Sequence, residues 1–240
     1  MGEAGVSLPQ QGDFDARRAA GKRKADELRA HYLDRGDPLA WFEACYREAH
    51  GDVARIPWAK MTPRPELVEW LGQLPAERRR GRVLDVGCGL GDNAIVLAEA
   101  GFEVTAFDIS ATAVEWAAQR FADRAIDWQS ANLVAPPEAW RGAFDLVSEI
   151  YTLQTLRPPY REAAIQALAS FVKPGGTLLL IGRGRHTDEP ESPPPWPLTL
   201  DELEVFETHG LERVQFENFM APRKDREVRH FRVEYRRPGG

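Results

Sequence analysis

Short apolar runs alternate along the chain with longer segments in which apolar residues recur every three or four positions. The short runs predict strands, and the longer segments predict amphipathic helices. The expected strands span residues 83–86, 103–108, 126–130, 143–148, 177–181, 211–219 and 228–235. The helices expected among them span residues 92–100, 111–121, 161–172 and 199–209. Ser110 is a suitable N-cap for the second of these helices.

Strands that alternate with helices, and a first strand that is almost entirely apolar, predict a parallel sheet covered on both faces. The last two strands are joined by only a short loop, which permits a hairpin but no parallel crossover. We therefore expect an α/β fold with a mixed sheet, in which ligands bind at the carboxyl ends of the strands.

The part of the chain ahead of this sheet has a different pattern. Residues 1–15 show little periodicity and predict a mobile tail. Residues 16–80 predict a helical cap, and residues 81–240 the sheet domain, with a proline-rich insertion at 183–198. The helices expected in the cap span residues 16–33, 39–49 and 66–74.

Composition narrows the function classes. The chain has 240 residues, 43% hydrophobic and 28% charged, which is ordinary for a soluble globular protein, and no apolar run approaches the ~18 residues of a membrane span. A net charge of -6 argues against a nucleic acid partner. Residues 1–11 resemble no secretory signal, and two cysteines are too few for a disulfide framework, so we expect a cytoplasmic protein. The histidines and cysteines lack metal-binding spacing, which predicts no metal site.

A glycine-rich turn follows the first strand, with Gly87, Gly89 and Gly91 at alternate positions. Glycines remove Cβ atoms where the backbone turns sharply and a ligand approaches closely. The dinucleotide fingerprint has its third glycine one residue later, where this chain has Asp92, whose charge would repel a pyrophosphate. The second strand ends in Asp108, at the distance typical of a carboxylate that binds a ribose. The turn therefore favours an adenosine cofactor without pyrophosphate.

Four motifs, in the same order, resemble those of the class I S-adenosylmethionine-dependent methyltransferases. They are residues 83–91, Asp108, residues 144–147 and residues 172–178. The resemblance covers residues 81–182. It implies a Rossmann-like, seven-stranded mixed sheet with an antiparallel last strand and helices on both faces, S-adenosyl-L-methionine as the cofactor, and methyl transfer as the reaction.

The resemblance also implies roles for the residues of the cofactor site. Asp108 would accept hydrogen bonds from the ribose hydroxyls, and Ile109 would lie against the adenine. Asn132 stands where many relatives have Asp. The positions expected to bind the cofactor are Trp58, Asp85, Gly87, Cys88, Gly89, Gly91, Asp108, Ile109, Asn132, Leu133 and Glu149. For Asp85 the alternative is a helix-capping role, and for Cys88 it is packing.

A narrower resemblance concerns the substrate end. Prolines at 57, 63 and 65 exclude regular helix and predict a shaped loop around Trp58. This loop and the preceding aromatic helix with Trp41 are similar to the N-terminal segment of thiopurine, thiol and halide methyltransferases and of tellurite-resistance methyltransferases. In those relatives the tryptophan loop covers the cofactor and excludes water, which favours attack by a soft nucleophile. The alternative is a buried tryptophan without a role in the reaction.

We expect the acceptor pocket at the carboxyl end of the fourth strand, where Glu149, Tyr151 and Gln154 follow closely on one another. Glu149 and Tyr151 are the candidate catalytic residues. Glu149 is a candidate base, or it instead neutralises the sulfonium of the cofactor or caps a helix.

The segment after the fifth strand provides further residues that could bind the methyl acceptor. Arg183 and Arg185 are placed to bind an anionic substrate, or they belong to a solvated turn. Trp196 lies in a stiff run of prolines that is expected to form one wall of the pocket.

Methyl transfer from a sulfonium is a direct displacement, so the protein must mainly align the nucleophile, the methyl carbon and the leaving sulfur. A thiol is the favoured acceptor because, with a pKa near 8.5, it is already partly ionised at neutral pH. The alternatives are an N- or O-methyltransferase of a small metabolite and a protein that binds the cofactor without turnover. The sequence leaves open whether the protein is a monomer or a homodimer.

Overall fold

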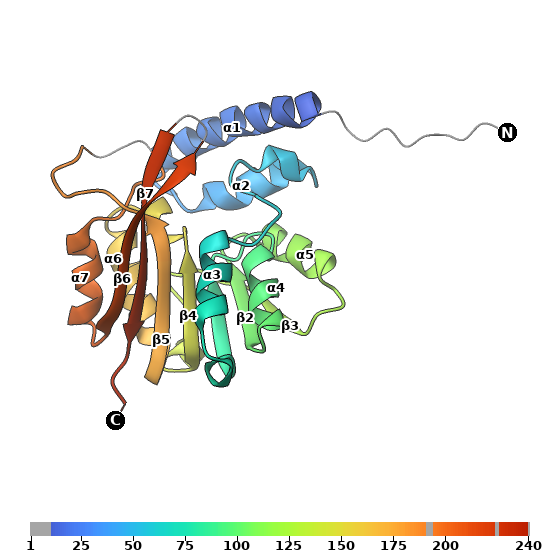
Figure 1. The fold of residues 1–240 in the computed structure, drawn as a ribbon. Coiled ribbons are helices and arrows are strands. Elements are labelled where there is room, and N and C mark those ends of the chain that lie inside the picture. The colour runs from blue at the N-terminus through green and yellow to red at the C-terminus, as the bar shows by residue number, and fades with distance from the viewer. Residues whose placement is uncertain (1–10, 191–193, 224–225, 240) are drawn as a thin grey trace.

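A computed structural model describes residues 11–190, 194–223 and 226–239, and it contains a single seven-stranded sheet over these residues, in the order β3-β2-β1-β4-β5-β7-β6 (Figure 1). The strands are β1 Arg82–Val86, β2 Glu103–Asp108, β3 Ile126–Ser130, β4 Phe144–Ile150, β5 Val172–Arg183, β6 Glu212–Arg223 and β7 Arg226–Arg236. The helices are α1 Gln11–Asp34, α2 Ala40–Ala49, α3 Pro65–Gln73, α4 Asp92–Glu99, α5 Ala111–Arg120, α6 Tyr160–Phe171 and α7 Leu200–Thr208. Four 3-10 turns, η1 to η4, cover Val53–Arg55, Ala76–Arg78, Glu138–Trp140 and Leu153–Thr155.

The pairing of the strands confirms the mixed sheet. Strands β1 to β5 are parallel, while β7 is antiparallel to both β5 and β6. The β6–β7 hairpin therefore forms the antiparallel edge that the short connection between the two strands predicts.

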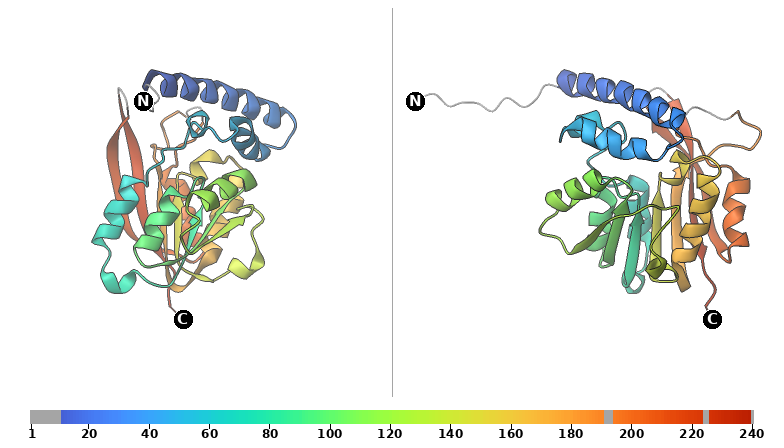
Figure 2. Two further views of the ribbon diagram at one scale, coloured as in Figure 1. Left: turned by 90° about the vertical axis from the view of Figure 1, so that its right-hand side faces the viewer. Right: turned by 180° about the vertical axis from the view of Figure 1, so that it is seen from behind.

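Helices cover both faces of the sheet (Figure 2) because successive strand residues point to opposite sides. In β1, Val83 packs into a core with α3 and α4, to which Leu67 and Leu97 contribute. The next residue, Leu84, packs into the core on the other face, to which Leu168 of α6 and Phe206 of α7 contribute.

Helices α1 and α2 lie across one end of the sheet, above the carboxyl ends of the parallel strands (Figure 1). Helix α1 packs on η1 at Gly21, where an added Cβ would lie 2.1 Å from the carbonyl oxygen of Arg55. The helix begins at Gln11, so residues 11–15, which the sequence predicts as a mobile tail, are helical. The rest of the predicted tail, residues 1–10, lies outside the described residues.

Other boundaries also differ from the predicted ones, among them those of β4 and β5. Strand β4 continues to Ile150, two residues further than expected. Residues 173–176, which lie between the expected helix and the expected strand, form part of β5, and the pairing register with β4 shifts between Phe144 and Leu146. At Gly176 an added Cβ would lie 2.9 Å from the carbonyl oxygen of Lys173, so the backbone folds tightly there although the strand continues.

The carboxylate of Glu43 joins α2 to the sheet domain. It accepts hydrogen bonds from Ser110 Oγ at 2.6 Å and from Thr112 Oγ1 and N at 2.7 and 3.2 Å. Ser110 is the N-cap of α5, as the sequence predicts, and its hydroxyl accepts from the amide of Ala113. Partial burial by itself raises the pKa of Glu43, but the hydrogen bonds from Ser110 and Thr112 outweigh it and lower this pKa.

We expect the Glu43→Ala variant to be about 1–3 kcal/mol less stable than the wild type, because it leaves the Ser110 and Thr112 donors without their charged acceptor. Urea unfolding measures the change. The matched control is Glu48→Ala on the same helix, where the carboxylate is half exposed and lies 3.9 Å from Lys24 Nζ. Equal stability of the two variants would contradict a role for Glu43 as the anchor of α2.

Candidate active site

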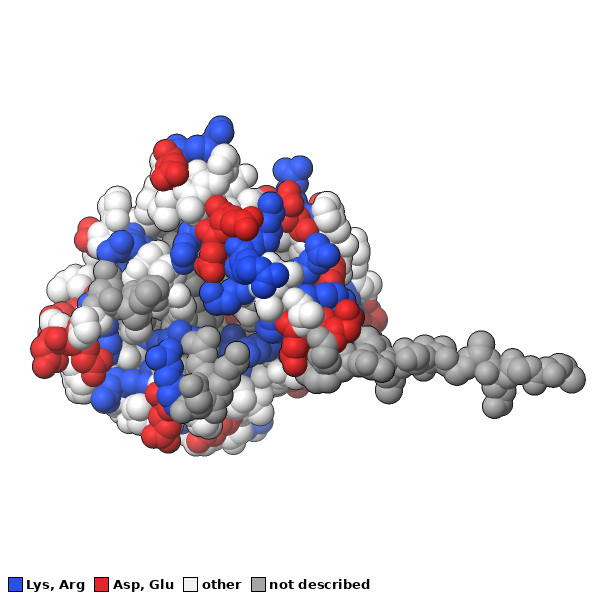
Figure 3. All heavy atoms as spheres, turned by 90° about the horizontal axis from the view of Figure 1, so that it is seen from above, with Lys and Arg blue, Asp and Glu red and all other residues white. Residues whose placement is uncertain are grey.

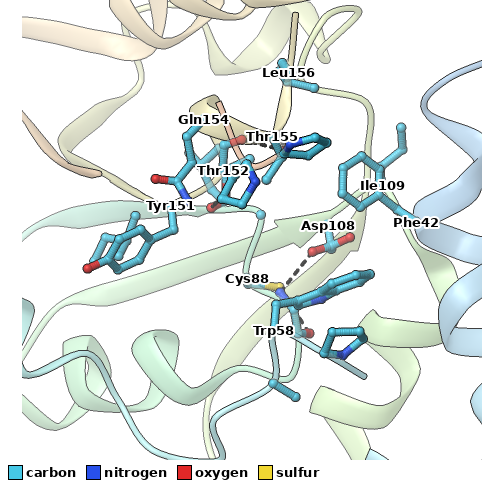
Figure 4. A pocket seen from close by; sticks show the side chains of 18 of the residues that line it. Phe42, Trp58, Cys88, Asp108, Ile109, Tyr151, Thr152, Gln154, Thr155 and Leu156 are labelled. Atoms are coloured by element: carbon cyan, nitrogen blue, oxygen red, sulfur yellow. Dashed lines mark hydrogen bonds between the residues drawn. The ribbon is translucent and has the colours of Figure 1, made fainter. Parts of the chain in front are cut away.

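A cavity of about 590 Å³ lies between the carboxyl ends of the strands and the helices α1 and α2. Its size is within the range of small-molecule sites. Its floor comes from the turn after β1 and the end of β2, its roof from α1, α2 and the loop around Trp58, and its end wall from the segment after β4 together with Arg183 and His230. Figure 4 shows Trp58, Cys88 and Asp108 close together, with Tyr151 and Gln154 further along the cavity.

The three glycines of the turn after β1 all have positive φ. Two of them make room for the protein's own side chains. At Gly87 an added Cβ would lie 2.2 Å from Thr152 Oγ1, and at Gly91 it would lie 2.5 Å from the ring of Trp128. At Gly89 the nearest atom would be Tyr46 Oη at 3.2 Å. The glycines therefore let side chains of the protein pack against the turn, and they also permit its positive φ angles.

Asp108 ends β2 beside this turn and is buried. Its Oδ2 accepts from the amide of Gly89 at 2.9 Å, and its Oδ1 accepts from the amide of Ser110 at 2.9 Å. Burial raises the pKa of Asp108, although these amides act in the opposite direction. Each carboxylate oxygen can accept two hydrogen bonds, so both retain capacity for a donor from the cavity.

The roof of the cavity is aromatic. Trp58 makes edge contacts with Trp41, Phe42 and Tyr46, at centroid distances of 5.4, 6.2 and 5.9 Å. Its indole Nε1 donates to Tyr46 Oη at 2.9 Å. Burial and the nearby Asp108 raise the pKa of Tyr46, which keeps its phenol neutral. A rigid apolar surface therefore faces the glycine turn.

Tyr151 stands at the end wall in a strained backbone conformation, with φ of 65°. Its amide donates to Ile181 O of β5 at 2.8 Å, and its hydroxyl donates to Glu66 Oε1 at 3.2 Å. The guanidinium of Arg64 lies 4.5 Å from the centroid of its ring, and His230 of β7 contacts the ring edge at 5.7 Å. Burial and the Glu66 carboxylate raise the pKa of Tyr151, so the phenol is neutral at physiological pH. Such strain is typical of functional sites.

Two acidic residues of the predicted site lie beneath the cavity and do not line it. Glu149 is 1% exposed, and its Oε1 accepts from the amides of Thr152 and Leu153 at 2.8 and 2.7 Å. Asp85 is also 1% exposed. Burial raises the pKa of both carboxyl groups to about 7, and for Asp85 the neighbouring Asp108 and Glu149 act in the same direction. Glu149 thus shapes the segment that carries Tyr151.

The structure brings most of the predicted site residues together around this one cavity. Those that line it are Trp41, Trp58, Gly87, Cys88, Gly89, Asp108, Ile109, Asn132, Leu133, Tyr151, Gln154, Arg183 and Trp196. Those that do not are Asp85, Gly91, Glu149 and Arg185. The Nη1 of Arg185 donates to the backbone carbonyls of its own loop, at residues 186, 187 and 189, so it holds that loop together.

Several predicted residues have interactions that the sequence does not reveal. The Oδ1 of Asn132 accepts from the amide of Val134 at 3.0 Å, which fixes the local turn. The Oε1 of Gln154 accepts from the amide of Arg183 at 2.7 Å, so Gln154 connects the β4 segment to β5. Burial, with Asp108 and Asp85 nearby, raises the pKa of the Cys88 thiol, which makes it a poor nucleophile.

Sequence reasoning missed other residues of the wall. Lys22, Asp26 and Arg29 reach the cavity from one face of α1, and their spacing of four and three residues was the signal. Glu66 and His230 carried no such signal, because they meet Tyr151 only through the packing of α3 and the register of β7. Seen from above, Lys and Arg side chains lie on several sides of the hollow in this face (Figure 3).

Comparisons with known proteins agree with this arrangement. A family model described as a methyltransferase domain matches residues 83–176. The 2-heptyl-1-hydroxyquinolin-4(1H)-one methyltransferase of Mycobacteroides abscessus is 26% identical over 68% of this chain and 72% of its own length. The probable thiol methyltransferase 2 of Arabidopsis thaliana is 28% identical over 75% of this chain and 80% of its own length.

The fold has a solved counterpart over nearly the whole chain. The 1,6-didemethyltoxoflavin-N1-methyltransferase of Burkholderia thailandensis, solved with its substrate and S-adenosylhomocysteine, superposes with a TM-score of 0.58. It is 16% identical and covers 97% of this chain and 92% of its own. The family model, these relatives and the fold together support a class I S-adenosylmethionine-dependent methyltransferase. This confirms the family, the fold and the enzyme class that the motifs predict.

No helix among the described residues is long and apolar enough to cross a membrane. No group of three or more His, Cys, Asp or Glu side chains in the same part of the chain is arranged to hold a metal ion.

The raised pKa values of Asp85 and Glu149 predict a pH dependence of stability. Both groups favour folding when protonated, so their contribution is complete below about pH 4 and is lost as the pH rises through about 7. Between pH 5 and pH 8 the free energy of unfolding of the wild type should fall, and we expect it to fall by roughly 2 kcal/mol less in Asp85→Asn, which has no carboxyl group to ionise at this position. Urea unfolding without cofactor measures this difference. Asp123→Asn, at a side chain 80% exposed, is the control, and parallel curves for all three proteins would contradict the prediction.

Proposed function

We propose that this methyltransferase transfers the methyl group of S-adenosylmethionine to a small molecule inside the cavity. The observation that supports this best is the enclosure of the glycine turn and Asp108 under an aromatic roof, in one cavity of about 590 Å³. Such a volume has room for a cofactor and a small acceptor side by side.

The chemistry of the floor fits S-adenosylmethionine. Asp108 retains acceptor capacity for the ribose hydroxyls, and Ile109 and Leu133 offer apolar contact to the adenine. Asp85 lies beneath this floor, and its buried Oδ2 has no hydrogen-bond partner among the described residues. When bound, the cofactor supplies an activated methyl group on a sulfonium.

The remaining walls would align the acceptor and keep water out. Trp41, Phe42 and Trp58 form a rigid roof, and Trp196 and Gln154 close the far end. Trp196 donates its amide to Gln154 O at 2.8 Å, which fixes this closure. Alignment in a dry pocket is the main contribution a protein makes to a direct displacement.

Two acceptor classes are supported by different observations. A thiol is favoured by the water-excluding aromatic roof and by the likeness to the probable thiol methyltransferase. An oxygen or nitrogen acceptor on a flat heterocycle is favoured by the likeness to the hydroxyquinolinone and didemethyltoxoflavin enzymes and by the polar groups around Tyr151. The chemical groups at the end wall, and not the cofactor site, distinguish the two acceptor classes.

We expect Asp108→Ala to weaken the binding of S-adenosylmethionine by at least about 100-fold, because it removes the ribose acceptor and releases the Gly89 amide. Isothermal titration calorimetry measures the affinity, and circular dichroism checks that the variant is folded. Asp123→Ala, at an exposed side chain, is the control. Unchanged affinity in the Asp108 variant would refute the proposed cofactor site.

A panel of thiols, sulfide, halides, phenols, hydroxyquinolines and heterocyclic amines, with product detection by mass spectrometry, tests the reaction. We expect products from flat aromatic acceptors, because their rings can pack against the aromatic roof. Tight cofactor binding without product from any member would instead indicate a protein that binds the cofactor without turnover.

A further inference from the structure

The carboxylate of Glu66 has an unusual environment at the cavity wall. Its Oε1 accepts from the hydroxyl of Tyr151 at 3.2 Å. Its Oε2 is buried and has no hydrogen-bond partner in the described part of the chain. Glu66 lines the cavity together with Arg64 and Tyr151.

A buried carboxylate oxygen without a partner is costly, and structures keep such groups where a ligand supplies the missing donor. Two features of the surroundings of Glu66 bear on its electrostatics. It lies in the first turn of α3, where the helix dipole favours a negative charge, and the guanidinium of Arg64 stacks on the ring of its partner Tyr151. Glu66 is therefore prepared to receive an O–H or N–H donor from inside the cavity.

The other carboxylates along the cavity already have partners. Asp108 accepts from two backbone amides, and Asp92 pairs with Arg120 at 2.9 Å. Asp26 pairs with Lys22 at 2.8 Å. Among the acidic residues that line the cavity within the described chain, Glu66 is the one with a buried oxygen that lacks a partner.

The backbone around Tyr151 is built to hold this pair in place. Tyr151 keeps its positive φ because its amide bonds to β5 and its ring packs between Arg64 and His230. The Tyr151 hydroxyl donates its hydrogen bond to Oε1 of Glu66, so Oε2 remains able to accept a hydrogen bond from a ligand. Conformational strain at such a position is maintained only when the surrounding structure enforces it.

We propose that Glu66 is the residue that accepts the proton of the methyl acceptor, and that the acceptor is a hydroxyl or N–H group on a small aromatic molecule. This rests on the proposed function. The lone pair of the acceptor oxygen or nitrogen forms the bond to the methyl carbon, the bond from that carbon to the cofactor sulfur breaks with its electron pair on sulfur, and the acceptor proton moves to Glu66 Oε2. A preformed thiolate or halide would instead be repelled by this carboxylate.

Glu66→Gln tests the assignment with two matched series of acceptors, substituted phenols and substituted thiophenols, assayed at pH 7.5. We expect kcat/KM for phenols to fall about 100-fold, the usual effect of losing a general base, with larger losses for less acidic phenols. Thiophenols, which are ionised at this pH, need no base and lose the repulsion by the Glu66 carboxylate, so we expect their rates to stay the same or to rise.

Glu69→Gln is the matched control. Glu69 lies one turn further along α3, its side chain is 60% exposed, and it pairs with Arg232 at 3.1 Å. We expect this variant to keep wild-type rates with both series. A structural defect in α3 would lower both series equally in either variant, and that result, or an unchanged phenol rate in Glu66→Gln, would overturn the assignment.

Binding provides a readout that does not depend on turnover. Calorimetry of the phenols against the protein saturated with S-adenosylhomocysteine is expected to show about tenfold weaker binding in Glu66→Gln than in the wild type. If the wild type neither methylates nor binds any phenol, the acceptor class is wrong. If the wild type did not bind S-adenosylmethionine at all, the proposed function itself would be overturned.

Discussion

The carboxylate of Asp108 is the contact on which the site depends. It bonds the amide of Gly89 in the turn after β1 and the amide of Ser110 at the start of α5. Ser110 in turn donates to Glu43, which belongs to α2. One buried acidic residue therefore connects the glycine turn, the first turn of α5 and the helix above the cavity. Because charged hydrogen bonds are strong only when their geometry is kept, these three segments hold one another in register.

This network explains how an acidic, enclosed site remains stable. Asp85, Asp108 and Glu149 crowd the carboxyl edge of the sheet, and burial raises the pKa of each. The backbone amides that bond to Asp108 and Glu149 offset part of the cost of burying them. The remaining negative field is suited to a cofactor that carries an ammonium and a sulfonium.

Much of the fold follows from the sequence because its signals are local. The short apolar runs identify every strand of the sheet, Ser110 marks the start of α5, and the acidic end of β2 identifies Asp108. The start of α1 was missed because residues 11–15 are mostly polar, and the helix is held by a close contact at Gly21 with Arg55 that no local pattern announces.

The site was harder to predict wherever it depends on contacts between distant segments. The sequence places Glu149 at the acceptor pocket from its position after β4, but its side chain turns beneath the cavity to bond the amides of the next turn. Glu66 and Tyr151 are 85 residues apart and meet only because α3 packs beside the end of β4. Spacing along the chain carries no information about such pairs.

The cavity has two kinds of wall, and they respond differently to mutation. The floor depends on the pairing register of the parallel strands, in which a shift of one residue would turn every side chain to the opposite face. The roof consists of side chains on two helices and a loop, which can be exchanged one at a time. Substitutions in the roof can therefore change the shape and polarity presented to an acceptor while the floor stays the same. The names of the relatives reported above indicate different acceptors, as this division of the walls allows.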